Sequence, residues 1–384
     1  MFDFDQIIDR RGTAAKKWDK FAGRDMLPFW IADMDFPTPP DVQAALQARL
    51  DHGILGYAQT PDGLSEQVAE WLANNGGYRP RAEHMIWLPG VVPGLNLAAI
   101  VLARSGGAVA MATPVYYPFR STPQVCNQRS VEVPLVLNGA RWEMDFARLE
   151  AAFAAESVTS FLLSNPQNPT GRAYTREELT RLAEIALRHD VWIISDEIHS
   201  PLVIDERCEH ISIAGLDPEI ARRTVTLHAM TKAYNLAGLN AAVAVIEDDA
   251  VRQRFADARE GLVSLISPLA FTGAQAAYGD SSDYLPQLRR YLQRNHAALN
   301  QCVAGIEGVT TTPVEATYLS WLDVRELELA APGEHFEAHG LALSDGAEFG
   351  GPGFVRFNFA APASVVAQGL ARLQRACDAA QTAA

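Results

Sequence analysis

The sequence predicts an α/β protein with a mainly parallel sheet covered by helices on both faces, followed by a smaller α+β unit. In the middle of the chain, short apolar segments alternate with helical segments, which is typical of a parallel sheet. After about residue 280 the pattern changes to a long helix followed by fewer and more widely spaced strands. At 384 residues the chain is long enough for two domains.

Six apolar segments are the predicted strands of the parallel sheet. They are MIWL, AVAMA, SFLLS, VWIIS, TVTLH and AAVAVI, at residues 85–88, 108–112, 160–164, 191–195, 224–228 and 241–246. VWIIS is nearly all apolar, so we expect it to be buried on both faces. Helices are expected between the strands. Residues 93–104 form an apolar one, and the capping box of Thr175 and Glu178 begins another that ends near Asp190.

The smaller unit is predicted from the C-terminal part of the chain. A long helix is expected at 284–306, strands near 317–324 and 354–359, and a last helix at 364–381. We therefore expect a large domain over residues 44–282. Residues 1–43 and 283–384 should form an N-terminal arm and a small C-terminal domain.

The composition is that of an ordinary globular protein and argues against two classes of partner. Apolar residues make up 48% and charged residues 20% of the chain. The 32 Lys and Arg against 46 Asp and Glu give a net charge of −14, which repels nucleic-acid phosphates and anionic lipids. The longest apolar runs are far shorter than the roughly 20 residues of a membrane span. We expect no nucleic acid and no membrane as partners.

The cysteines and the first residues favour the cytoplasm. The four cysteines lie far apart without a CxxC pair, which indicates reduced thiols. The first residues, MFDFDQIIDRRGT, lack the apolar core of a signal peptide.

His335 and His339 have helical spacing, but Phe336 stands where the zinc-protease motif needs Glu. We therefore expect no metal site.

Two charged residues follow predicted strands, where parallel sheets bind ligands. Asp196 follows VWIIS, and a buried carboxylate needs a cation or several donors. It could cap the next element or pair with a protonated pyridine nitrogen, with His199 on the same face of the turn. Lys232 follows TVTLH in a small, apolar segment. It could be a lysine whose stem alone is buried, or an amine whose pKa is lowered for attack on an aldehyde.

Three further features would complete a site for an anionic cofactor and a carboxylate. Asn168 lies in the rigid loop NPQNPTG after a strand; it could present its amide to the site or belong to a plain turn. The backbone amides of Val91 and Val92 should point from a helix N-terminus toward an anion such as phosphate, and Thr231 adds a hydroxyl. Arg356, in the apolar strand FVRFNF, could hold a substrate carboxylate through its two-pronged guanidinium or form an internal salt bridge.

Together, NPQNPTG, SDEIH, TKAYNLAGL and FVRFNF resemble the fold-type I pyridoxal-phosphate family in order and spacing. The segments LPFWIADMDFPTPPDVQAAL, GILGYAQTPDGL, LPGVVPGLN, TPVYYPF and EATYLSWLD are similar to the carbon–sulfur β-lyase branch, the cystathionine β-lyases of the MalY/PatB type. The resemblance covers about residues 10–362. It implies the fold of class I/II aminotransferases, with a seven-stranded sheet, and pyridoxal 5'-phosphate as cofactor.

The resemblance also implies roles for the residues closest to the reaction. Lys232 should hold the cofactor covalently and transfer the substrate's α-proton, and Asp196 should pair with the pyridine nitrogen. Tyr116 should stack on the cofactor ring and count with these two as catalytic. Asn168 should bind the phenolic oxygen of the cofactor, with His199 on the same side.

The remaining implied roles concern the phosphate, the substrate and a second subunit. Val91, Val92 and Thr231 should bind the phosphate. Tyr57 should reach the phosphate of the neighbouring subunit, which makes a homodimer the working unit. Arg356 should hold the α-carboxylate of a small amino-acid substrate.

The sequence departs from the common aminotransferase pattern at several positions. Asn240 stands where many aminotransferases have a phosphate-binding arginine, and Ala229 where they often have serine. His199 takes the place of a tyrosine, and Leu202 that of a usually acidic residue. The first two weaken the interpretation as an aminotransferase.

The predicted function is therefore a carbon–sulfur β-lyase that cleaves cystathionine or a related cysteine S-conjugate to a thiol, pyruvate and ammonia. An aminotransferase with the same site residues is the first alternative. A regulatory protein that retains the fold is another, although no helix-turn-helix segment with a basic face is evident.

Overall fold

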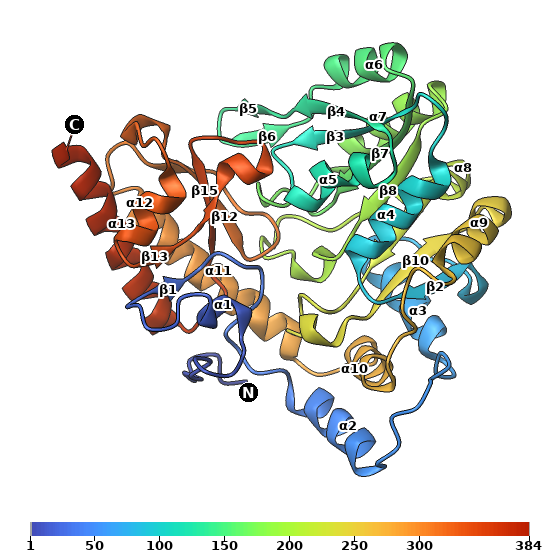
Figure 1. The fold of residues 1–384 in the computed structure, drawn as a ribbon, viewed down its shortest axis with the longest axis horizontal. Coiled ribbons are helices and arrows are strands. Elements are labelled where there is room, and N and C mark those ends of the chain that lie inside the picture. The colour runs from blue at the N-terminus through green and yellow to red at the C-terminus, as the bar shows by residue number, and fades with distance from the viewer. Residues whose placement is uncertain (1, 384) are drawn as a thin grey trace.

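The computed structural model describes residues 2–383, and its largest element is a seven-stranded sheet (Figure 1). The strands lie in the order β2-β10-β9-β8-β7-β3-β4. Strand β10 is antiparallel to its neighbours β2 and β9, and the other pairs are parallel. The bounds are β2 Met85–Leu88, β3 Ala108–Thr113, β4 Arg129–Pro134, β7 Val158–Ser164, β8 Trp192–Asp196, β9 Thr224–His228 and β10 Ala242–Ile246. The predicted mainly parallel, seven-stranded sheet is confirmed.

Helices cover both faces of this sheet. Successive side chains along a strand point to opposite faces, so each strand contributes to two apolar clusters. Ala108 and Ala110 of β3 belong to one apolar cluster, whereas Val109 and Met111 belong to another. The first cluster includes side chains of α6 Phe146–Ala155, α7 Arg176–Arg188 and α8 Pro218–Arg222. The second includes side chains of α4 Val91–Leu102, α5 Tyr117–Val125 and α9 Asp249–Arg259. All residues of β8 are buried, as the sequence predicts.

Two helix starts show how local sequence sets the elements next to the site. Helix α7 begins with the predicted capping box, in which Thr175 and Glu178 satisfy each other's backbone amides. Helix α4 begins at Val91, two residues before the predicted start at Pro93. Proline needs no hydrogen-bond acceptor in the first helical turn, so Pro93 is tolerated inside that turn and does not mark its beginning.

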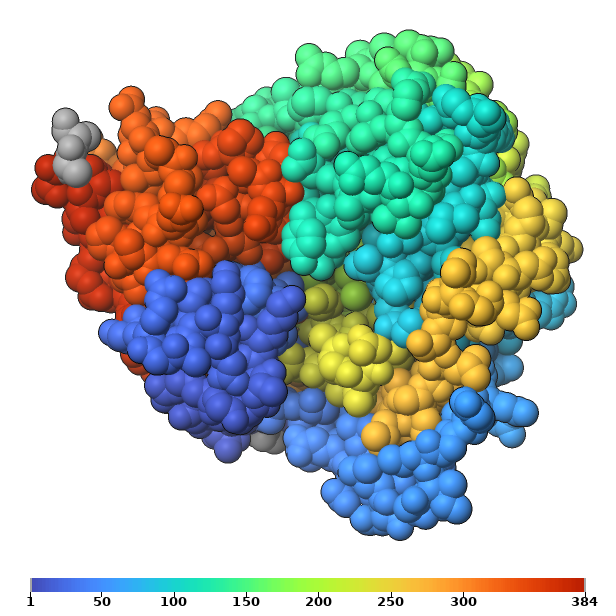
Figure 2. Space-filling view, viewed as in Figure 1, coloured from blue at the N-terminus to red at the C-terminus, as the bar shows by residue number. Residues whose placement is uncertain are grey.

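The smaller unit is built on a four-stranded sheet in the order β11-β12-β15-β14. These strands are β11 Thr310–Thr311, β12 Leu319–Asp323, β14 Ser344–Asp345 and β15 Phe354–Asn358. The same unit contains helices α11 Tyr284–Val303, α12 Pro332–Ala338 and α13 Ala363–Ala383. The N-terminal arm lies against this unit (Figures 1 and 2), and its strand β1 Leu27–Pro28 pairs in parallel with β13 Leu341–Ala342.

The remaining elements belong to the N-terminal arm or to the part of the chain that contains the large sheet. They are α1 Lys16–Asp19, α2 Pro40–Asp51, α3 Leu64–Gly76, α10 Pro268–Tyr278 and the hairpin of β5 Val136–Asn138 with β6 Arg141–Glu143. Helix α2 and the segment that follows it project from the body of the molecule (Figure 1). No helix within residues 2–383 is both long and apolar enough to span a membrane.

Candidate active site

Most of the predicted site residues lie around one cavity of about 290 Å³. Strands β2, β7, β8 and β9 all run in the same direction, so the residues that follow them meet at one edge of the sheet. On the face shown in Figure 2 the molecule is hollowed between the dark-blue arm and the teal and yellow segments. The predicted residues that line the cavity are Val91, Val92, Tyr116, Asn168, Asp196, His199, Thr231 and Lys232.

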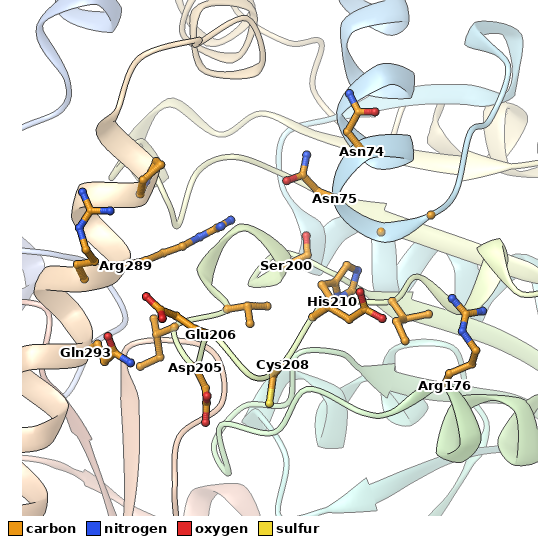
Figure 3. Close-up of a pocket in the computed structure, with 18 of the residues that line it drawn as sticks. Asn74, Asn75, Arg176, Ser200, Asp205, Glu206, Cys208, His210, Arg289 and Gln293 are labelled. Atoms are coloured by element: carbon orange, nitrogen blue, oxygen red, sulfur yellow. The ribbon is translucent and has the colours of Figure 1, made fainter.

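A second, larger hollow of about 570 Å³ uses a different set of residues. Asn74 and Asn75 of α3, Ser200, His210, and Arg289 and Gln293 of α11 surround it (Figure 3). It contains none of the predicted site residues. Size alone does not make a catalytic site. The smaller cavity is the better candidate because it brings together ionisable groups with perturbed pKa values.

Lys232 lies four residues beyond β9 and is partly buried in the wall of the candidate cavity. Its Nζ donates to the carbonyl oxygen of Ala32 at 2.7 Å. Burial, together with the positive charge of Arg356, lowers the pKa of this amine to about 8. The amine is therefore neutral, and nucleophilic, in a far larger fraction of molecules near neutral pH than an ordinary lysine.

Asp196 ends β8 and is buried. Among the described residues, the hydrogen bond that the structure gives it comes from the backbone N–H of Ile198, at 3.1 Å. Burial raises the pKa of the carboxyl to about 7. Within residues 2–383 this carboxyl forms no ion pair, although the charge of Lys232 acts on it from a distance. Its position in the cavity wall leaves it available to a cationic partner.

His199 is buried beside the same cavity, with its ring 5.9 Å from that of Tyr318. Burial lowers its pKa well below the ordinary value, and the charges of Lys232 and Arg356 act in the same direction. Its Nδ1 has no hydrogen-bond partner among residues 2–383. The imidazole is therefore neutral and keeps one ring nitrogen free.

Arg356 of β15 is buried against this site. Its guanidinium donates to Asn168 Oδ1 at 3.0 Å, to the Trp30 carbonyl at 2.7 Å and to Ser344 Oγ at 3.3 Å. All three acceptors are uncharged. The described residues therefore form no internal salt bridge with Arg356, which was the alternative considered from the sequence. Burial lowers the pKa of Arg356 to about 10. Since Asn168 gives its oxygen to Arg356, its amide NH₂ is free to donate elsewhere.

The opposite end of the cavity is suited to an anion. Val91 and Val92 form the first turn of α4, where backbone N–H groups have no partner within the helix. Thr231 and Asn240 line the same cavity. Asn240 takes a left-handed backbone conformation (φ 58°) that asparagine tolerates better than most residues. It therefore lies beside the cavity without supplying the charge of an arginine.

Tyr57 is the predicted site residue that the structure does not bring to the cavity. Its side chain is 98% exposed, in the segment that follows α2. Exposed apolar neighbours include Ile54 and Leu55. Within one chain, Tyr57 therefore contributes nothing to the site.

A backbone segment that the sequence analysis left without a role closes the site from the arm side. We call residues 30–36 the strap. Asn358 Nδ2 donates to the carbonyls of Ile31 and Asp33, both at 2.7 Å. Asn235 Nδ2 donates to those of Met34 and Phe36, both at 2.9 Å. The strap lies within LPFWIADMDF, but acceptor carbonyls leave no signature in a sequence; the asparagines that bind them were the only available signal.

The comparisons with known proteins agree with this geometry. The family model described as "Aminotransferase class I and II" matches residues 24–373. The chain therefore belongs to the class I and II aminotransferase family, which confirms the resemblance seen in the sequence.

Named relatives are similar over nearly the whole chain. Cystathionine beta-lyase PatB of Bacillus subtilis (strain 168) is 34% identical, covering 97% of this chain and 99% of that protein. The crystal structure of OvoB matches with a TM-score of 0.94 and 38% identity, over 98% of this chain and 99% of that one. A pyridoxal-phosphate-bound C–S lyase from Staphylococcus hominis, in complex with L-cycloserine, matches with a TM-score of 0.93 and 28% identity, over 98% of both chains.

Proposed function

We propose that this protein is a pyridoxal-phosphate-dependent carbon–sulfur β-lyase that acts on cystathionine or a related cysteine S-conjugate. The observation that carries the proposal is the pair of perturbed groups in one cavity, the Lys232 amine and the Asp196 carboxyl, whose pKa values are about 8 and about 7. The names of the relatives support the lyase rather than the aminotransferase.

The unpaired groups of the cavity fit the parts of this cofactor. Asp196 would pair with the ring nitrogen, and the amide NH₂ of Asn168 would donate to the phenolic oxygen beside neutral His199. Tyr116 would stack on the ring. The first-turn amides of α4 and the hydroxyl of Thr231 would hold the phosphate. When bound, pyridoxal phosphate supplies a pyridinium ring that withdraws the electrons left by the departing α-proton.

The protein's own residues would orient the substrate and move its proton. Arg356 would hold the α-carboxylate through the two NH₂ groups of its guanidinium. Within residues 2–383, the groups that accept hydrogen bonds from it are uncharged. Lys232 Nζ would take the proton from the α-carbon, and Asp196 would keep a proton on the ring nitrogen. Loss of the β-thiolate, which takes up a proton to become the thiol, would leave aminoacrylate, and water would hydrolyse this enamine to pyruvate and ammonia.

Replacing Arg356 by lysine should reduce kcat/KM at least tenfold and leave the cofactor content unchanged. Lysine keeps the charge but loses the paired donors, each of which contributes about 1.5–3 kcal/mol to a charged group. Steady-state kinetics and cofactor absorbance measure both. Arg172→Lys is a matched control, because Arg172 is equally buried but pairs with Glu178 and Glu315 outside the cavity. An unaltered kcat/KM in Arg356→Lys would place the carboxylate site elsewhere.

Product analysis separates the lyase from the aminotransferase. Purified enzyme given L-cystathionine and no 2-oxo acid should release pyruvate, ammonia and homocysteine continuously, because elimination returns the cofactor to its starting form in every turnover. An aminotransferase would stop after one equivalent and resume only with an acceptor such as 2-oxoglutarate, without releasing a thiol. That second result would replace the lyase by the aminotransferase.

We further propose that the working unit is a homodimer in which Tyr57 completes the phosphate site of the neighbouring subunit. The support is the exposure of Tyr57 on a projecting segment, together with exposed Ile54, Leu55, Leu262 and Leu265. Analytical ultracentrifugation tests it, since a monomer with full cofactor content and activity is incompatible with a shared site.

The division of the chain and its location complete the proposal. Residues 44–282 would form the large domain, since they contain every strand of the seven-stranded sheet. Residues 1–43 and 283–384 would form the arm and the small domain. Hydrogen exchange should then show two cooperative units with these limits.

A cytoplasmic location is supported by four free cysteines and is testable by cell fractionation.

A further inference from the structure

The carbonyl oxygen of Ala32 accepts two hydrogen bonds from side chains. Lys232 Nζ donates to it at 2.7 Å, and the hydroxyl of Tyr318 donates to it at 3.0 Å. Ala32 is 7% exposed and Tyr318 is fully buried. Because a carbonyl oxygen has two lone pairs, these two donors use its whole capacity.

Tyr318 is held in place by an unusual backbone conformation. The preceding residue, Thr317, has a φ of 78°, in the left-handed region that β-branched residues rarely adopt. Thr317 N donates to the Leu202 carbonyl at 2.8 Å, and Thr317 Oγ1 accepts from Leu319 N at 3.1 Å. Conformations of this kind persist where the surroundings impose them, and they cluster at functional sites. Here the conformation aims the Tyr318 hydroxyl at the strap.

Several charged or titratable groups surround the amine that shares this carbonyl. Arg356 of β15, Asp33 of the strap and Asp196 of β8 act on the Lys232 amine electrostatically. His199 lines the same cavity and is neutral, because burial lowers its pKa well below the ordinary value. Tyr318 stays protonated because burial raises its pKa well above the ordinary value. Tyr318 does not line the cavity. Its hydroxyl meets the site at the Ala32 carbonyl, and its ring lies 5.9 Å from that of His199.

We propose that Tyr318 is a positioning residue for Lys232. Its hydroxyl fixes the Ala32 carbonyl oxygen and, by sharing it, makes that oxygen a weaker acceptor for the lysine ammonium. The neutral amine is thereby favoured and is held at one place in the cavity wall. This inference rests on the proposed function, because it is the neutral amine of Lys232 that the cofactor and the substrate's α-proton require.

Replacing Tyr318 by phenylalanine tests this in the full chain. Without the hydroxyl, the carbonyl holds the ammonium more strongly, so the pKa of Lys232 should rise by about 0.5 unit or more, which means about threefold less neutral amine near pH 7. Competitive labelling of the cofactor-free chain with trace acetic anhydride across pH 6–11, read by peptide mass mapping, measures this pKa. In the holoenzyme, kcat should fall severalfold while KM stays within about twofold of the wild-type value.

The matched control is Tyr284→Phe. Tyr284 is also buried, and its hydroxyl donates to a backbone carbonyl, that of Ala233, at 3.2 Å. Lys232 does not donate to that oxygen. The control should lower thermal stability and leave the pKa of Lys232 unchanged. If Tyr318→Phe does not fold, 3,5-difluorotyrosine at position 318 replaces it as the test. Its hydroxyl is a stronger donor, so the pKa of Lys232 should then fall.

Three results would overturn the inference: an unchanged Lys232 pKa in Tyr318→Phe, an equal shift in Tyr284→Phe, or a rise with difluorotyrosine. None of these measurements needs the cofactor. Failure of the proposed function is seen separately, as absence of cofactor on Lys232 after borohydride reduction.

Discussion

Lys232→Ala should abolish covalent attachment of the cofactor and reduce turnover by several orders of magnitude, with the fold intact. The variant loses both the amine that attacks the aldehyde and the group that moves the α-proton. The fold should survive because Lys232 is partly buried and its side-chain hydrogen bond goes to one carbonyl, that of Ala32. Borohydride reduction followed by peptide mass mapping measures attachment, and circular dichroism measures the fold.

The sequence makes this experiment unusually clear. The chain has four lysines: Lys16, Lys17 and Lys20 in the arm, and Lys232. Lys17 is buried in ion pairs with Asp33 and Asp35, and Lys20 is exposed and lies near Glu337. Lys20→Ala therefore serves as the control and should keep full labelling and activity. Reduced cofactor attached to any arm lysine of the wild-type protein would contradict the assignment of Lys232 as the residue that holds the cofactor.

Asp196→Asn should slow removal of the α-proton by orders of magnitude while preserving the shape of the cavity. Asparagine cannot keep the ring nitrogen protonated as a carboxylate does, and that charge matters most in the transition state. The rate of exchange of the substrate's α-deuterium measures this step directly. Turnover like that of the wild-type protein in Asp196→Asn would rule out the pairing of Asp196 with the ring nitrogen.

The same substitution should stabilise the cofactor-free protein. In the folded chain the pKa of Asp196 is raised from 3.8 to about 7, so folding becomes less favourable as pH rises through this window. Ionising this buried carboxyl lowers the free energy of unfolding. The loss is complete above about pH 7 and absent below about pH 4, and it is at most about 4 kcal/mol. Asp196→Asn should therefore raise Tm at pH 8 and have little effect on it at pH 4. Equal Tm values for the two proteins at pH 8 would show that the buried carboxylate is already compensated.

Much of the fold could be predicted because apolar segments in a sequence indicate buried strands. Six of the seven strands of the large sheet were found in this way. The strand that was missed, β4 with sequence RSVEVP, lies at the edge of the sheet and alternates apolar with polar or charged residues. Strand β8 in the interior of the sheet, in contrast, is buried on both faces. The opposite edge strand, β2, has the apolar sequence MIWL and was found. The alternating pattern of β4, which exposes one face, is therefore the reason that this strand gave too weak an apolar signal.

The site could be predicted to the extent that its side chains follow strands. Asp196 and Lys232 stood out because a charge beside an apolar strand needs an explanation, and the structure brings both to one cavity. The contact of Ala32 with Lys232 and Tyr318 could not be predicted, because it depends on a backbone oxygen brought in from the arm. The roles of these residues stay predictions until the variants are measured.

The strap also determines when the active site can exist during synthesis of the chain. Its carbonyls are bonded by Arg356 and Asn358, partners that lie 326 and 327 residues further along the sequence. A ribosome-bound chain that ends before these residues cannot close the strap, however well its large sheet has formed. Contacts over such separations form late because the intervening chain must first be ordered. Capture of the cofactor in its final environment therefore requires that the chain has been synthesised through Asn358, and it reports that the last strand of the small sheet has docked.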